Sequence, residues 1–390
     1  LGGPGGEAPA APDAGTPPAG EWRAAWISYI ELQGMDYTSA EAFRAGAAAM
    51  MDRCAGLGLN TVIVQVRPFG DALYPSALFP WSHICTGVQG VSPGFDPLDI
   101  LLTEAHSRGL SFEGWINPYR LQASASSPGT LAADNLANTH PDWVAAAGGG
   151  LYLNPAIPEA AAYVVEGVAE LVRTYPVDGV HFDDYFYPTT DPAIDAARFA
   201  ASGAADLAEW RRQNVTALVK AAHDAVKAAD PTLRFGVSPQ GNPDNDMSQQ
   251  YSDVRGWLAA GSEDAVVDYL CPQLYWGYGY TLSNGSRRFA YENILAEWLA
   301  MPRGSAALYV GLGAYRIGEG DGGSNGDSVS GWSTGRALAD QVGTLRAAGA
   351  GGYALYRYGS LFQNTAWPQL AEAECAALTA ANAPDGGRAG

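Results

Sequence analysis

Short runs of β-branched and aromatic residues alternate with longer, alanine-rich amphipathic segments from residue 22 onward. The short runs are typical of buried strands and the amphipathic segments of helices. Strands are predicted over 22–27, 60–68, 110–118, 178–185, 234–239, 267–275, 307–315 and 352–359. Helices are predicted over 39–57, 97–108, 157–174, 203–229, 251–260, 287–300, 335–348 and 367–380.

Eight strand-helix repeats predict an α/β fold, a (β/α)₈ TIM barrel over residues 21–382. A doubly wound open sheet is the alternative, but no G-x-G-x-x-G follows the first strand. The polar or glycine-rich insertions become long βα loops on the carboxyl face, where barrel enzymes carry their active sites. These insertions are 68–96, 118–156, 185–202 and 316–334.

The alternation of side chains within each strand separates the barrel interior from the helix-facing side. In the second strand Val62, Val64 and Val66 share one parity and should face the helices. Applied to each strand, this rule predicts an interior lined by polar groups: Gln65, Arg67, Glu113, Asn117, His181, Asp183, Ser238, Gln273 and Tyr275. A structural polar network would explain part of this set, but so many polar groups favour a functional site.

The composition narrows the choice of partners and of location. With 41 acidic and 22 basic residues the net charge is −19, which disfavours nucleic acid and anionic membrane surfaces. No apolar run is long enough for a spanning helix. Residues 1–20, rich in glycine, proline and alanine, predict a flexible linker left after a removed export or lipoprotein signal. We therefore expect a secreted or envelope-anchored protein. We also expect a second flexible segment at 383–390, and a monomer.

The cysteines and the common motifs exclude several chemistries. The cysteines are scattered without a C-x-x-C, which argues against a disulfide scaffold or a zinc cluster and leaves one or two disulfides open. They are Cys54, Cys85, Cys271 and Cys375. The sequence has no G-x-S-x-G, no H-E-x-x-H and no phosphate-binding loop. No cofactor is expected.

Carboxylates beside aromatic side chains remain, and they indicate glycoside hydrolysis. Asp183 has the inward parity of the fourth strand, whereas Asp184 has the outward parity but stands at the last strand residue. The general acid stays open: Glu113 points inward, and loop carboxyls offer alternatives in Asp244, Asp246 and Glu319. Aromatic residues suited to sugar stacking, or to loop packing, gather at the predicted carboxyl ends: Tyr119, Tyr185, Tyr187, Tyr275, Trp276, Tyr278, Tyr356 and Tyr358.

Several motifs occur in order at these strand ends. They are WRAAWISYIEL, GLNTVIVQVRPFGDALYPS, GWINPYR, VDGVHFDDYFYP, FGVSPQGN, VDYLCPQLYWGYG and YVGLGAY. In these motifs the chain resembles the glycosyl-hydrolase-like family ten, bacterial envelope or secreted (β/α)₈ barrels, over about 21–363. The resemblance implies glycosidase activity on cell-wall glycans such as denuded peptidoglycan strands.

The resemblance also implies functional residues. It places Asp183 and Asp184 at the catalytic strand end. The residues predicted for substrate binding, some of them implied by the resemblance and the others added as candidates, are Gln65, Arg67, Asp71, Asn117, Tyr119, Arg120, His181, Tyr185, Ser238, Gln273, Tyr275, Trp276, Tyr315 and Arg357.

The working hypothesis is endo-acting, retaining hydrolysis of a polymer that contains N-acetylhexosamine. Asp183 would be the nucleophile, or would orient the substrate's acetamido group while a second carboxyl gives the proton. His181 and Arg67 are predicted to keep Asp183 ionised. Two alternatives stay open: a noncatalytic glycan-binding barrel, and a metal-dependent hydrolase or deacetylase using His181, Asp183 and Asp184.

Overall fold

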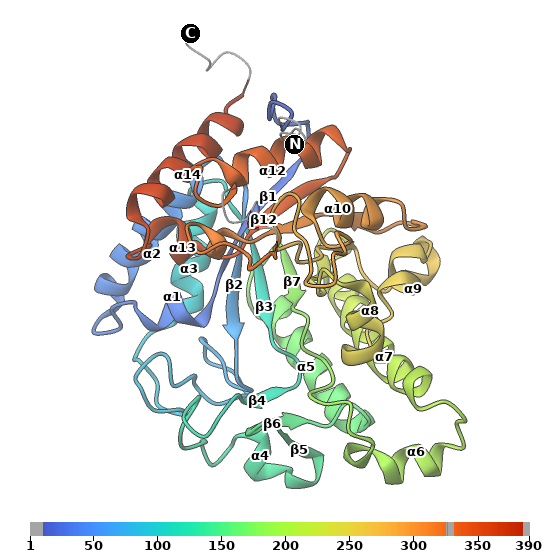
Figure 1. The fold of residues 1–390 in the computed structure, drawn as a ribbon. Coiled ribbons are helices and arrows are strands. Elements are labelled where there is room, and N and C mark those ends of the chain that lie inside the picture. The colour runs from blue at the N-terminus through green and yellow to red at the C-terminus, as the bar shows by residue number, and fades with distance from the viewer. Residues whose placement is uncertain (1–10, 325, 327–330, 385–390) are drawn as a thin grey trace.

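The computed structural model describes residues 11–324, 326 and 331–384. Within these residues nine parallel strands form one sheet in the order β10-β9-β8-β7-β3-β2-β1-β12-β11 (Figure 1). They are β1 (Trp22–Ile27), β2 (Thr61–Arg67), β3 (Ser111–Ile116), β7 (Gly179–Phe182), β8 (Arg234–Val237), β9 (Tyr269–Leu270), β10 (Ala307–Leu308), β11 (Val310–Leu312) and β12 (Gly352–Leu355).

β10 and β11 together occupy one strand position of the barrel. Only Tyr309 separates β10 from β11, and β10 pairs with β9 while β11 pairs with β12. The sheet therefore closes on itself through a single split strand. The predicted (β/α)₈ barrel is confirmed, with each predicted strand present at its expected place.

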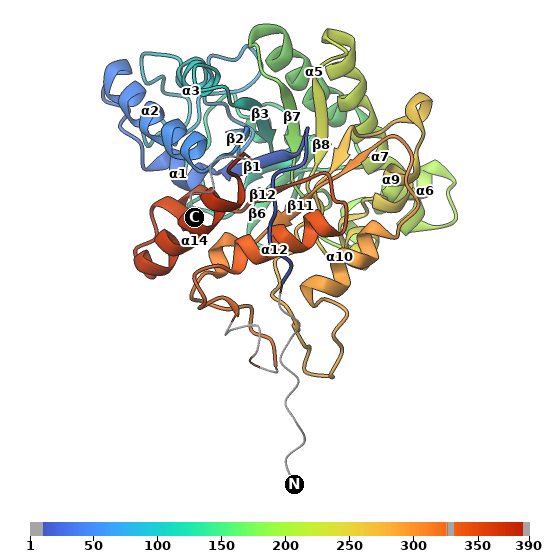
Figure 2. The same ribbon diagram turned by 90° about the horizontal axis from the view of Figure 1, so that it is seen from above.

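A ring of helices surrounds this sheet (Figure 2). The helices are α2 (Ala40–Gly56), α3 (Pro97–His106), α5 (Pro158–Thr174), α7 (Leu207–Ala229), α9 (Val254–Ala259), α10 (Tyr291–Leu299), α12 (Ala337–Ala347) and α14 (Pro368–Ala381). Shorter helices lie in the connections: α1 (Tyr29–Gln33), α4 (Leu136–Thr139), α6 (Ala196–Ser202), α8 (Pro243–Asn245) and α13 (Tyr358–Phe362).

Several of the helices begin at a side-chain cap. Ser39, Asp96 and Asp206 each accept a hydrogen bond from the backbone three residues on, at the starts of α2, α3 and α7. Such caps satisfy donors that the first helical turn leaves free and stabilise a helix by about 1 kcal/mol each. Local sequence and global fold therefore agree on where these helices start.

The core has two layers, one inside the barrel and one between the barrel and its helices. The inner layer contains Trp22, Ala24, Trp26, Ile63, Trp115, Tyr269, Cys271, Tyr309 and Ala354. Close packing there depends on a missing side chain, because a Cβ atom on Gly236 would lie 2.0 Å from the ring of Tyr269. The barrel interior is thus a packed core below the carboxyl ends of the strands.

The parity prediction holds along β2 up to a bulge. Val62, Val64 and Val66 pack in the outer layer as predicted. Between Gln65 and Arg67 the register with β3 shifts, so that Arg67 opposes Ile116. An extra residue at a bulge reverses the side that later residues face.

The prediction that Arg67 points into the barrel is therefore wrong. Its guanidinium lies 3.7 Å from the ring centre of Phe79, and a Cβ atom on Gly167 of α5 would lie 2.4 Å from its Nη1. Arg67 is buried on the helix side. It cannot serve as the predicted neighbour that keeps Asp183 ionised.

The insertion over 118–156, predicted as a loop, carries an antiparallel sheet of β4 (Arg120–Gln122), β6 (Gly150–Leu153) and β5 (Val144–Ala147). In Figure 1 this sheet lies beyond the carboxyl ends of β2 and β3. It gives Arg120 a fixed place beside the barrel mouth.

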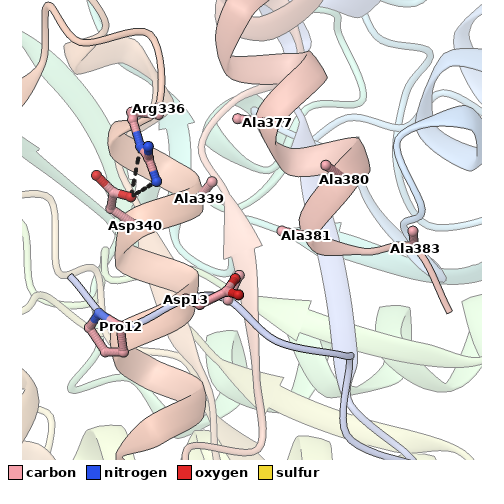
Figure 3. Close-up of a pocket in the computed structure, with 10 residues that line it drawn as sticks. Pro12, Asp13, Arg336, Ala339, Asp340, Ala377, Ala380, Ala381 and Ala383 are labelled. Atoms are coloured by element: carbon pink, nitrogen blue, oxygen red, sulfur yellow. Dashed lines mark hydrogen bonds and ion pairs between the residues drawn. The ribbon is translucent and has the colours of Figure 1, made fainter. Parts of the chain in front are cut away.

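A groove of about 610 Å³ lies on the outer wall between α12 and α14 (Figure 3). Alanine side chains line it, together with the ion pair of Arg336 and Asp340 and the segment at Pro12. Arg346 donates a hydrogen bond to the backbone oxygen of Ala14. Part of the predicted 1–20 linker thus lies against α12, whereas 1–10 and 385–390 lie outside the described residues.

No helix in the described part of the chain is both long and apolar enough to cross a bilayer.

Candidate active site

A cavity of about 220 Å³ opens where the barrel strands end. Its walls combine two carboxyl groups with aromatic rings and amide or hydroxyl groups. The lining residues are Trp26, Trp115, Asp183, Asp184, Tyr185, Ser238, Gln273, Tyr275, Tyr315 and Tyr356. Binding sites are commonly of this kind, mostly apolar with a few polar groups in fixed positions.

Asp183 is held by three hydrogen-bond donors. Its Oδ2 accepts hydrogen bonds from the side-chain amide of Asn117 and, at 3.2 Å, from the indole nitrogen of Trp115. Its Oδ1 accepts one from the backbone N–H of Tyr185 at 3.3 Å. All three groups donate, which fixes the orientation of Asp183 and favours its charged form against the opposing effect of burial.

The orientation of Asn117 is itself determined by a chain of hydrogen bonds. The backbone N–H of Tyr29 donates to Gln65 Oε1 at 2.7 Å. Gln65 Nε2 in turn donates to Asn117 Oδ1 at 2.6 Å, which turns the amide NH₂ group toward Asp183. Gln65 and Asn117 both point inward as predicted.

Asp184 lines the same cavity because β7 ends at Phe182, so strand alternation no longer applies at this position. Its Oδ1 accepts a hydrogen bond of 3.0 Å from Gln273 Nε2, which also donates to the backbone oxygen of Ser238. Asp184 is half-buried, whereas Asp183 is buried. The outward parity of Asp184 therefore does not set its direction, and both carboxyls face one space.

Electrostatics make the two carboxyls a coupled pair. Burial, and then the charge of Asp184, raise the pKa of Asp183, and burial likewise raises the pKa of Asp184. The positive charge of Arg120 opposes both shifts. Arg120 is stacked over Phe69 at 4.4 Å and anchored by its Nε to the backbone oxygen of Pro68. The pair therefore retains a proton to higher pH than free aspartates would.

His181 and Glu113 form a polar chain beneath the cavity. Trp26 Nε1 donates to His181 Nε2 at 3.1 Å, and His181 Nδ1 lies 2.8 Å from the hydroxyl of Tyr269. Tyr269 donates to Glu113 Oε1 at 2.8 Å. Burial lowers the pKa of His181 to about 3 and raises that of Glu113 to about 7. His181 is therefore neutral, with its proton on Nδ1.

This placement corrects the prediction of Glu113 as a catalytic acid. Its carboxyl is bound to Tyr269 in the barrel interior, and His181 lies between that layer and the cavity wall formed by Trp26. Both ring nitrogens of His181 are occupied, which leaves neither for a metal ion. Across the described residues, no group of three or more His, Cys, Asp or Glu side chains is arranged to hold one.

A second cavity of about 340 Å³ continues from the first, because both are lined by Gln273, Tyr275 and Tyr315. Trp276, stacked on Phe289 with ring centres 5.1 Å apart, forms part of its wall. Its other lining residues include Gln240, Asn242, Asn245, Tyr280 and Arg316. The predicted residues Ser238, Gln273, Tyr275, Trp276, Tyr185 and Tyr315 are thus brought together around the two cavities.

Other predicted binding residues lie elsewhere. Asp71 accepts hydrogen bonds from the Phe69 backbone and from Gln89 Nε2, and so fixes its own loop. Tyr119 is buried. Arg357 forms an ion pair of 2.7 Å with Glu31. Of the loop acids, Asp244 pairs with Arg288 and Glu319 accepts from Trp367 Nε1, so both are engaged away from the cavity.

The prediction omitted two aromatic wall residues from its site, Trp26 and Trp115, whereas Tyr356 was among the aromatic residues predicted for sugar stacking. The signal was present for Trp26, which has the same parity as Trp22 and Ala24 of the inner layer and stands near the carboxyl end of β1. Trp115 has the inward parity that its strand predicted.

The sequence was compared with models of known protein families. A family model described as glycosyl hydrolase-like 10 matches residues 21–325. The chain belongs to that family. The resemblance seen in the sequence motifs is therefore confirmed.

Two relatives of this glycosyl hydrolase-like 10 protein are named glycosyl hydrolases. YngK of Bacillus subtilis (strain 168) is 38% identical over 323 residues, which cover 76% of this chain and 61% of the relative. DigH of Escherichia coli (strain K12) is 36% identical over 299 residues, covering 69% of this chain and 65% of the relative. The chain thus spans less than two thirds of either relative.

A solved structure shares the fold of this glycosyl hydrolase-like 10 protein. The α-L-fucosidase isoenzyme 2 of Paenibacillus thiaminolyticus superposes with a TM-score of 0.58 and 18% identity. The match covers 91% of this chain and 49% of the fucosidase. At this identity the likeness shows a common barrel fold and nothing about the substrate.

Proposed function

We propose that this protein is a glycoside hydrolase that cleaves a bacterial cell-wall-type glycan containing N-acetylhexosamine, within the chain and with retention of configuration. One observation carries the proposal: Asp183 and Asp184 face a single aromatic-walled cavity, where Asp183 accepts three hydrogen bonds and Asp184 is the more open of the two. The names of the curated relatives also support hydrolysis of glycans.

The proposed reaction uses the substrate's own acetamido group. Asp183 accepts the acetamide N–H and orients the carbonyl oxygen, which attacks the anomeric carbon as the glycosidic C–O bond breaks. Asp184 gives its proton to the leaving oxygen. Water then attacks the anomeric carbon of the cyclic intermediate and gives a proton back to Asp184. The product keeps the configuration of the substrate, and both carboxyls return to their starting states.

The two alternative functions find less support. A metal-dependent reaction would need His181 as a ligand, but both of its ring nitrogens are hydrogen-bonded. A noncatalytic glycan-binding barrel would not need two adjacent carboxyls in one cavity, since desolvating them is costly. The noncatalytic alternative also predicts that the protein binds glycans, but it predicts no cleavage of them.

The first test compares an N-acetylated glycan with its de-N-acetylated form. Wild-type protein is expected to cut amidase-stripped peptidoglycan strands and to lose at least about 10²-fold of this rate after de-N-acetylation, because no oxygen nucleophile remains. Products are measured by chromatography of reducing ends.

The matched control is Asp183→Asn, which keeps the size of the side chain. This variant should be slow on the N-acetylated glycan, by about 10²-fold or more, because it cannot orient the acetamide as a carboxylate does. Wild-type binding without products would support the noncatalytic alternative. Equal rates on both glycans would contradict substrate assistance.

The second cavity supports a polymeric, carboxylate-bearing substrate. Among its lining residues none is acidic, although the chain has 41 acidic residues. Arg316 is half-buried there, with its Nε bound to the backbone oxygen of Tyr275 and its guanidinium over Tyr315 at 4.7 Å. Its two terminal nitrogens have no carboxylate partner within the described residues. A sugar carboxylate would provide one.

Replacing Arg316 with Gln is expected to raise KM about tenfold for a glycan that carries carboxylates, since one charge-assisted hydrogen bond is lost. KM for the same glycan after carboxyl amidation should change little. Arg255→Gln, at an exposed position on α9, is the matched control. An equal KM increase for both glycans would contradict recognition of the carboxylate.

Export and attachment to the cell envelope stay predictions from the sequence, and so does the monomeric state. An envelope location would suit a protein acting on cell-wall glycans.

A further inference from the structure

Arg120 is a cation beside the catalytic cavity that contacts no substrate in the reaction proposed above. It is half-buried at the start of β4, and its Nε donates to the backbone oxygen of Pro68 at 3.1 Å. In the part of the chain that the structure describes, no carboxylate forms an ion pair with Arg120. Its terminal nitrogens can therefore bind an anionic group through paired hydrogen bonds.

Three aromatic rings surround this guanidinium. Its central carbon lies 4.4 Å from the ring centre of Phe69, 5.9 Å from that of Tyr29 and 6.0 Å from that of Tyr185. Phe69 is fully buried, with its ring centre 5.2 Å from that of Tyr29. Tyr29 is half-buried, whereas Tyr185 is 53% exposed. The buried ring thus supports the guanidinium, and the two open rings provide amphipathic surface for a sugar.

This group is continuous with the catalytic cavity through Tyr185. The side chain of Tyr185 lines that cavity and also lies beside Arg120. Its backbone N–H donates to Asp183. A ligand on these rings would therefore be adjacent to the carboxyl pair. We refer to Arg120, Tyr29 and Tyr185 together as the Arg120 platform.

The Arg120 platform and the second cavity lie on opposite sides of the barrel mouth. Arg120 follows β3, whereas Arg316 of the second cavity follows β11. Around the closed sheet β7, β8 and β9 separate these two strands in one direction, and β2, β1 and β12 in the other. Phe69 after β2 and Trp276 after β9 are related in the same way. The catalytic cavity therefore lies between two groups that each combine an arginine with aromatic rings.

We propose that the Arg120 platform is a second sugar-binding subsite, on the other side of the scissile bond from the second cavity, and that it binds a sugar that carries a carboxylate. The sugar ring packs on Tyr29 and Tyr185, and its carboxylate accepts hydrogen bonds from the terminal nitrogens of Arg120. The inference rests on the proposed function and deepens it by assigning a further part of the substrate.

The position of the Arg120 platform determines which bond of a glycan is cleaved. A chain held on the platform and in the second cavity passes over Asp183 and Asp184, so the bond at these carboxyls is an internal one. Interactions on both sides fix the register of the chain, because moving it by one sugar separates a carboxylate from its arginine. Loss of the platform should therefore change the choice of bond as well as the affinity.

The test is the cleavage pattern of Arg120→Gln on an end-labelled, N-acetylated oligosaccharide that carries carboxylates and is long enough to bind in several registers. The ratio of cuts at the preferred bond to cuts at its neighbours should fall about tenfold, because a charge-assisted interaction that holds the register is lost. Mass spectrometry of the labelled products measures this ratio. An unchanged ratio would overturn the proposal.

The ratio separates recognition from the effect of the Arg120 charge on the carboxyl pair. That effect changes cleavage at every bond by the same factor and leaves the ratio as it was. After amidation of the sugar carboxylates, wild type and Arg120→Gln should give the same pattern. A persisting difference would contradict recognition of a carboxylate.

The matched control is Arg303→Gln, at an exposed position in the connection between α10 and β10. It should cut as the wild type does, and an equal shift in both variants would refute a specific role for Arg120. Tyr29→Ala is a second variant in case Arg120→Gln does not fold. It keeps the backbone N–H that donates to Gln65 and should shift the cuts in the same direction, and an unchanged pattern would again overturn the proposal.

A binding measurement does not depend on turnover. In an Asp184→Asn background, titration calorimetry should give a Kd for the same oligosaccharide about tenfold higher with Arg120→Gln than without it, and equal Kd values after amidation. If the wild type cleaves no glycan, the proposed function fails, while this comparison still decides whether the subsite exists. Equal Kd values for the carboxylate-bearing oligosaccharide would overturn the inference.

Discussion

Replacing Asp184 with asparagine is expected to lower kcat/KM on a glycan by about 10³-fold, because the leaving oxygen would depart without a proton. Asp184 is the more open member of the pair, and its Oδ1 accepts a hydrogen bond from Gln273. The loss should be far smaller on an aryl glycoside whose leaving group is already acidic. Steady-state kinetics on the two substrates measure the difference.

The paired control is Asp183→Asn, which should be slow on both substrates, since orientation of the acetamide does not depend on the leaving group. An Asp184→Asn variant as active as wild type on the glycan would refute its role as general acid. Equal losses of kcat/KM on both substrates would indicate that another group is the general acid.

The largest expected effect on stability comes from Arg211 on α7. Its Nε and Nη2 donate to both carboxylate oxygens of Asp195, at 2.9 and 2.7 Å, and both side chains are fully buried. Arg211 also donates to the hydroxyl of Tyr251 at 3.0 Å. Replacing it with Met should lower the free energy of unfolding by about 3–5 kcal/mol, because Asp195 would be left buried without its partner.

Denaturant unfolding followed by circular dichroism measures this change. The matched control is Arg336→Met, which removes an exposed ion pair with Asp340 and should cost less than about 1 kcal/mol. Equal destabilisation by the two variants would contradict the argument from burial. Arg211 connects the loop after β7 to the segment after β8 through its hydrogen bonds to Asp195 and Tyr251. The Arg211→Met variant should therefore also lose activity at denaturant concentrations below its unfolding midpoint.

Strand alternation predicted much of the fold and the site because it is a rule about backbone geometry. Phe112 and Ile116 pack outside the barrel, and Trp115 and Asn117 point in, as the pattern of that strand required. The rule failed where the backbone departed from a regular strand. The bulge before Arg67 reversed its side.

Residues outside strands were the hardest to place. Nothing in the sequence around Asp246 distinguishes a buried carboxyl from its exposed neighbour Asp244, since both lie in one polar segment. Arg357 was a reasonable binding candidate by its position, but its partner Glu31 lies more than 300 residues earlier in the chain. Long-range pairings of this kind require the folded arrangement.

The small cavity around Asp183 also has a meaning for inhibitor design. Its carboxyls and electron-rich rings, among them Trp26, Trp115 and Tyr356, surround a space of about 220 Å³. Carboxylates attract cations through charge, and aromatic faces do so through their quadrupoles. A compact ring bearing a protonated nitrogen combines both attractions in one molecule. Such a ring is therefore a suitable starting scaffold for a ligand that blocks this protein.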